Sequence, residues 1–125
     1  MLNQSNVRTS SYTTRKTILV DEQNSTALSC IVSDAGVSAD ESGAKVVKAG
    51  TPVAGSLTAR ETAFTVTTNG TGAVGVILHD VDVTNGPANS QVVIFGFIDV
   101  SKLDTEVVAM TEAAADTLKM IQFVK

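Results

Sequence analysis

The chain has 125 residues, of which 43% are apolar and 4% aromatic, and its formal charge is −4. This length suits one domain with one modest core. A core built from Val, Ile, Leu and Ala favours β-structure, because branched side chains fit a pleated sheet. The acidic balance argues against a DNA- or RNA-binding protein, which needs clustered Lys and Arg to neutralise phosphates.

The charge is divided between a basic start and an acidic remainder. Residues 1–20 hold three basic and no acidic side chains, which gives +3, whereas the other 105 residues hold six basic and thirteen acidic ones, which gives −7. Residues 1–15 are polar and without period, so we expect a flexible arm there and a single β-rich domain over residues 16–125. No apolar leader and no run of about 20 apolar residues is visible, so we expect no membrane partner.

Short strands separated by polar turns are expected in the first part of the domain. Apolar runs predict strands over residues 16–20, 27–32 and 45–49, with an acidic loop between the second and third. Pro52 cannot donate to a ladder, so its segment should lie at a strand start or a sheet edge. The single cysteine, Cys30, excludes an internal disulfide, and we expect it to be a buried, inert thiol.

The next segment predicts a strand and a tight hairpin. Residues 64–68 alternate, which places Phe64, Val66 and Thr68 on one face. Asn69-Gly70 follows directly, and this pair is a strong hairpin signal because both residues tolerate positive φ.

Two apolar strands are expected in the middle of the chain. Residues 73–83 form the longest predicted strand, with both faces apolar and buried as far as Leu78. Residues 91–100 form the next, and Gly96 at its middle indicates a bulge or a bend. Phe95 and Phe97 share one face of this strand, and their apolar neighbours predict that both rings pack in the core.

The last quarter changes to a helical period. Apolar residues recur at intervals of three and four, which predicts one helix face, with Asp104 as N-cap and Glu106 near the positive end of the helix dipole. Residues 120–125 return to alternation and predict a closing strand. We therefore expect a mainly β fold, a small β-barrel or β-tulip-like domain with one C-terminal helix. The residues of the predicted helix face are Val107, Met110, Thr111, Ala114, Leu118 and Ile121.

The sequence patterns that could indicate catalysis or metal binding lack the secondary structure that such sites need. Residues 70–75 fit G-x-G-x-x-G, but a β-branched strand follows where a dinucleotide site needs a helix. On a strand His79 points away from Asp80 and Asp82, so these groups cannot converge on a metal, and no G-x-S-x-G nucleophile elbow exists. We expect no enzyme, no cofactor and no metal site.

Three segments in a fixed order resemble a known family. They are GTPVAGSL (50–57), AVGVILHDVDVT (73–84) and VVIFGFIDVSKL (92–103), followed by a short helix and IQFVK (121–125). This order resembles the head decoration and head-fibre proteins of tailed bacteriophages, and it is similar in layout to the phage lambda decoration protein.

The resemblance implies a capsid cement that is made in the host cytoplasm and lies on the outer capsid surface of the virion. It implies a homotrimer that binds the major capsid protein through the N-terminal arm, without a nucleic-acid partner. The alternative is a head-fibre base or a carbohydrate-binding adhesion module on the virion. The arm residues that we expect to bind the capsid are Arg8, Tyr12, Arg15, Lys16, Ile18 and Val20.

Overall fold

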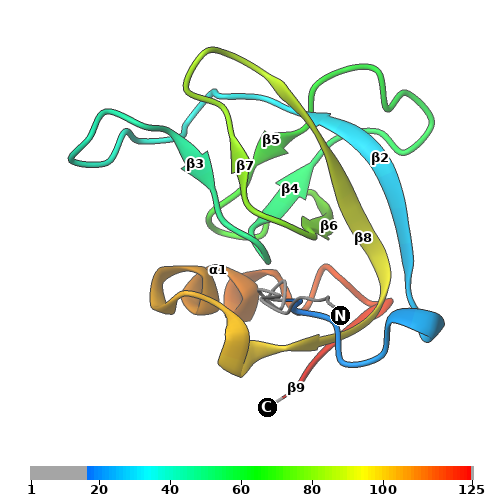
Figure 1. The fold of residues 1–125 in the computed structure, drawn as a ribbon. Helices are drawn as coiled ribbons and strands as arrows, with labels where there is room; N and C mark the ends of the chain where they lie inside the picture. The colour runs from blue at the N-terminus through cyan, green and yellow to red at the C-terminus, as the bar shows by residue number, and fades with distance from the viewer. Residues whose placement is uncertain (1–16, 125) are drawn as a thin grey trace, which may run out of the picture.

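The structure is a computed structural model that describes residues 17–124, and it is mainly β with one helix near the C-terminus (Figure 1). The predicted fold class is confirmed at this level, while the predicted arm over residues 1–15 lies outside the described residues. The strands are β2 (Thr26–Val32), β3 (Val46–Val47), β4 (Pro52–Ala54), β5 (Thr65–Val66), β6 (Ala73–Ile77), β7 (Val81–Asp82), β8 (Ala88–Asp99) and β9 (Ile121–Val124). The helices are the 3-10 turns η2 (Glu22–Asn24) and η3 (Val100–Lys102) and the α-helix α1 (Thr105–Ala114).

The main sheet has the strand order β2-β8-β6-β4-β5, all antiparallel, and β9 adds in parallel to β8. Its two outer strands approach at one isolated bridge, where Phe64 N donates to Ile31 O at 2.7 Å and Ser33 N donates to Phe64 O at 2.8 Å. The ladder does not continue beyond that bridge, so the pairings do not show the closed barrel of the sequence prediction. β3 and β7 form a separate two-stranded sheet.

β8 links the part of the domain that contains β2 and β6 with the part that contains β9, because its two ends have different neighbouring strands (Figure 1). Its first part pairs with β2 and β6, and its last four residues pair with β9. Gly96, where the pairing changes, has φ of 140°, a conformation that other residues rarely adopt. The register of β8 with β2 shifts between Val93 and Phe95, so the predicted bulge lies just before Gly96 rather than at it.

The strand predicted over residues 16–20 is reduced to one bridge beside β8. Leu19 pairs with Ile98, Val20 N donates to Phe97 O at 3.0 Å, and Asp99 N donates to Ile18 O at 2.8 Å. This short segment therefore runs antiparallel to β8 on the side opposite to β9.

Two buried clusters lie on opposite faces of the main sheet. Val76 and Val93 belong to one and Ile77 and Val92 to the other, because successive side chains of a strand point to opposite faces. The prediction that residues 73–78 are buried on both sides is confirmed. The first cluster also takes in α1 residues, and the second includes Cys30, Val53 and Phe64.

The long strand predicted over residues 73–83 is wrong, because the chain leaves the main sheet after β6 and resumes as β7 beside β3. At the break, Asp80 Oδ1 accepts the Ala49 N–H at 2.8 Å, so a side chain replaces a ladder partner. The strands predicted over 45–49 and 64–68 are also shorter, as β3 and β5 have two residues each.

The hairpin predicted at Asn69-Gly70 is wrong as well, since β4 lies between β5 and β6 in the sheet. Gly70 does have a positive φ of 80°, but its surroundings give the reason. A Cβ on Gly70 would lie 2.6 Å from Ala113 O and 2.6 Å from the Ala114 Cα. The glycine thus lets the turn pack directly against the backbone of α1.

The predicted helix face is confirmed as far as Ala114, where α1 ends, but its placement of Leu118 and Ile121 on the helix is wrong, because Leu118 follows the helix and Ile121 begins β9. Asp104 occupies the N-cap position, but its side chain makes no capping hydrogen bond. Its carboxylate lies 3.6 Å from Lys48 Nζ instead. The buried residues among those predicted for this face are Val107, Thr111, Ala114, Leu118 and Ile121.

Candidate functional site

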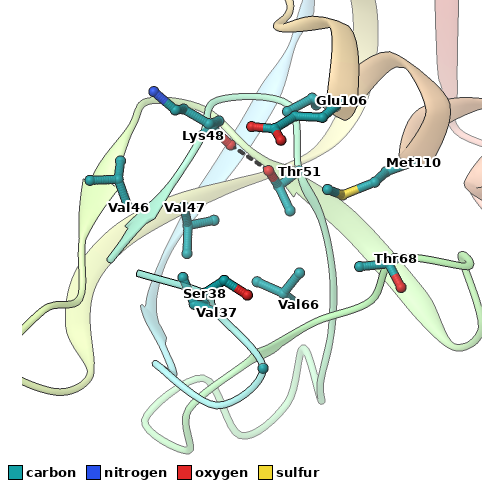
Figure 2. Close-up of a pocket in the computed structure, with 12 residues that line it drawn as sticks. Val37, Ser38, Val46, Val47, Lys48, Thr51, Val66, Thr68, Glu106 and Met110 are labelled. Atoms are coloured by element: carbon teal, nitrogen blue, oxygen red, sulfur yellow. Dashed lines mark hydrogen bonds between the residues drawn. The ribbon is translucent and has the colours of Figure 1, made fainter. Parts of the chain in front are cut away.

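A pocket of about 230 Å³ opens between the loop at residues 36–38, β3, β5 and α1 (Figure 2). Figure 2 shows Met110 extending from α1 toward Thr51, whose buried hydroxyl donates to Lys48 O at 2.7 Å. Valine side chains form much of the remaining wall, and Glu106 stands on the helix side. The volume is below the roughly 300–1,000 Å³ of typical ligand pockets. The one buried hydroxyl of the wall is already a donor to the backbone, and the described residues that line the pocket include no nucleophile hydrogen-bonded to a base.

A second hollow lies over the buried Cys30, at β2 and the loop that carries Arg60. The Arg60 guanidinium donates to Ser29 O at 2.8 Å and to Ser29 Oγ at 3.2 Å, which ties the loop to the strand. Burial raises the pKa of the Cys30 thiol above its ordinary value, and the positive charge of Arg60 offsets this only in part. The prediction of a buried cysteine is confirmed, and the raised pKa opposes thiolate chemistry at neutral pH.

The acidic residues that follow His79 support the backbone. Asp80 accepts from Ala49 N, and Asp82 accepts from Thr84 N at 2.8 Å and from the Thr84 hydroxyl at 2.5 Å. The hydrogen bond from the Thr84 hydroxyl is the main cause that lowers the pKa of the Asp82 carboxyl. Within residues 17–124, no group of three or more His, Cys, Asp or Glu side chains is placed to hold a metal ion.

The glycine motif at residues 70–75 leads into a strand. Gly70 and Gly72 have positive φ values of 80° and 71°, and β6 begins at Ala73. A dinucleotide site needs a helix N-terminus after these glycines, whereas a strand follows them here, as the sequence predicted.

An exposed apolar surface lies where residues 18–20, β8 and β9 run side by side (Figure 1). We call it the β8–β9 face and define it as Val20, Phe95, Phe97 and Met120, whose exposed fractions are 56%, 42%, 43% and 62%. The prediction that both phenylalanine rings pack in the core is therefore wrong. Exposed apolar patches of this kind mark interaction surfaces in soluble proteins.

The strand register makes this face continuous. Phe95 and Phe97 are two residues apart and so point to the same side of β8. Val20 lies opposite Phe97, since Leu19 pairs with Ile98. Met120 lies beside Phe95, because Gly96 pairs with Ile121 and Gly96 N donates to Met120 O at 3.2 Å.

The six residues predicted to bind the capsid are divided by the structure. Val20 is exposed and belongs to the β8–β9 face, whereas Ile18 is 1% exposed and packs in the first core cluster. The remaining four, Arg8, Tyr12, Arg15 and Lys16, lie outside the described residues. The sequence prediction missed Phe95, Phe97 and Met120, and the unbroken apolar run over residues 92–98 carries no signal that marks its exposed side.

No protein-family model matches this chain, and no curated protein matches it significantly. In the part of the chain that the structure describes, no helix has both the length and the apolar character needed to cross a membrane.

Proposed function

We propose that this chain is a capsid decoration protein, which binds the outer surface of a tailed-phage head and stabilises the lattice of the major capsid protein. The observation that carries the proposal is the order of apolar segments that resembles the decoration family. The exposed β8–β9 face, close in sequence to the basic N-terminal segment, gives the domain a surface suited to binding. The proposed role needs binding alone, without a cofactor or bond-making chemistry.

The N-terminal segment has the reach and charge for such a role. Sixteen residues precede Thr17, and a fully extended chain of that length spans at most about 55 Å. An extended peptide that adds to a sheet edge gains main-chain hydrogen bonds as well as side-chain contacts. A homotrimer would present three such arms to one lattice, so that weak contacts combine into tight binding.

The test is binding of the purified chain to expanded, undecorated heads assembled from the major capsid protein encoded in the same genome. The full chain should co-sediment with heads to a saturating occupancy and appear on the outer lattice by electron microscopy. A chain lacking residues 1–15 keeps the buried Ile18 and Leu19, so it should fold but lose at least tenfold in affinity. Native mass measurement of the full chain tests the homotrimer.

Two outcomes would count against this proposal in different ways. If the full chain fails to bind heads at any concentration, the decoration function is wrong. If the shortened chain binds as tightly as the full chain, decoration stands but the arm does not carry it.

The adhesion alternative gains one observation from the structure. Phe95 and Phe97 present two exposed rings on the same side of β8, and aromatic rings can stack on sugars. Binding of the isolated chain to cell-wall glycans on an array, lost on Phe97→Ser, would favour an adhesion module over a cement.

A further inference from the structure

We propose, building on the function proposed above, that the β8–β9 face is a second contact with the shell, directly beside the arm. The shell surface that it fits would present apolar side chains bordered by carboxylates. The face would then hold the domain flat on the lattice, while the arm reaches further along it.

The backbone beneath the face is already paired, so the side chains make the contact. Phe97 O accepts from Val20 N on one side, and Phe97 pairs with Gln122 of β9 on the other. Over β8 itself, a partner therefore meets side chains, because the ladders on both sides of Phe97 are already formed. This distinguishes the face from an arm that binds as an added strand.

The position of the arm indicates the same partner for both. Thr17 is three residues from Val20, and the segment runs antiparallel to β8, so the preceding residues join the domain at the border of the face. A surface that binds the arm at Thr17 would therefore lie within about 10 Å along the strand of Val20 and Phe97.

Charge argues for an acidic shell surface rather than for a second copy stacked face to face. Arg15 and Lys16 directly precede Thr17 in the sequence, so face-to-face copies would bring two basic segments together.

Acidic groups near the face are engaged within their own chain. Asp21 accepts from Gln23 N at 3.0 Å and from Asn24 Nδ2 at 2.6 Å. Asp99 accepts from Ser101 N at 3.0 Å and from the Ser101 hydroxyl at 2.6 Å. These carboxylates are oriented by local turns within the chain.

The experiment compares variants of the full chain on the same undecorated heads. Phe97→Ser removes one ring of the face and Met120→Ser its most exposed side chain, and Leu57→Ser is the matched control. Leu57 is 38% exposed but lies in the loop between β4 and β5, outside the face. Each variant is first checked for a native circular dichroism spectrum and for its mass in solution. Met120→Ser is the variant expected to disturb folding least, because Met120 is the most exposed of the four face residues.

We expect each face variant to bind heads at least tenfold more weakly than the unaltered chain, with the same mass in solution and unchanged binding by Leu57→Ser. If the unaltered chain binds heads and the folded face variants bind equally well, the face is not a shell contact, although the decoration function stands. If the face variants instead change the mass in solution, the face joins copies of the chain and the inference is overturned. If the unaltered chain does not bind heads, the proposed function itself fails.

Discussion

Replacing Gly70 with alanine tests how the turn before β6 is packed against the helix. Gly70 has φ of 80°, a left-handed conformation that costs a residue with a Cβ about 1–2 kcal/mol. The new Cβ would also lie 2.6 Å from Ala113 O and 2.6 Å from Ala114 Cα, which are backbone atoms that no rotamer change can move. Forcing the helix and the turn apart adds about 1–3 kcal/mol, as in other overpacked cores. We therefore expect Gly70→Ala to lower the free energy of unfolding by about 2–5 kcal/mol.

Gly36→Ala is the matched control for this substitution. Gly36 has nearly the same φ, 77°, but a Cβ there would meet no atom within 4 Å. Gly36→Ala should lower the free energy of unfolding only by the cost of placing a Cβ residue at positive φ, about 1–2 kcal/mol. Urea unfolding followed by circular dichroism gives both free energies, and the difference between them isolates the contact with α1. Equal losses for the two variants would refute the idea that Gly70 is required by the approach of the helix.

Three further predictions address the core, acid stability and the thiol. Phe64→Ala, at a fully buried ring, should cost about 3–5 kcal/mol in urea unfolding. Phe95→Ala, at an exposed ring, should cost below about 1 kcal/mol, and equal costs would refute the assigned burial. The Ser101 hydroxyl is the main cause that lowers the pKa of the Asp99 carboxyl, so the resulting stabilisation is present above the ordinary value of 3.8 and is lost as pH falls through the folded pKa. Ser101→Ala should raise that pKa in a carboxyl carbon-13 NMR titration, and an unchanged pKa would contradict this. Cys30 should react with an aromatic disulfide reagent only as fast as the native state opens, and immediate labelling would contradict its burial.

The sequence predicted the elements whose hydrophobic period is long and regular. β2, β8, β9 and the α1 face were all found, because each depends on side chains that must face a core. Burial of residues 73–78 on both faces was also predictable, since an apolar run without alternation fits only an internal strand.

The pairing of the strands could not be predicted from local signals. Asn69-Gly70 indicates positive φ, and the structure has it at Gly70, but a hairpin and a close helix approach require the same local conformation. The break after Ile77 depends on Asp80 accepting a hydrogen bond from Ala49, which is 31 residues away in sequence. Contacts of this range leave no periodic trace in the sequence around either residue.

The β8–β9 face escaped prediction for a related reason. Residues 92–98 are apolar or glycine throughout, so the sequence cannot tell which alternate side chains are covered. In the structure Val92, Val93 and Ile98 are fully buried, whereas Phe95 and Phe97 are not. The difference arises from which elements lie over each face, and this is decided by the whole chain.

The course of β8 suggests why large apolar residues persist on an exposed face. Before Gly96 the strand runs between β2 and β6, where covering layers bury Val92 on one side and Val93 on the other. After Gly96 it runs between β9 and residues 18–20, and Ile98 alone keeps the core side filled. The fold needs no large apolar side chain on the outer side of this end of β8, which faces away from the core side of Ile98. A polar residue there would lower the tendency to aggregate. Phenylalanine at position 97 is therefore better explained by a surface outside the chain than by the stability of the domain, and this reasoning ties the proposed shell contact to a feature that folding alone does not require.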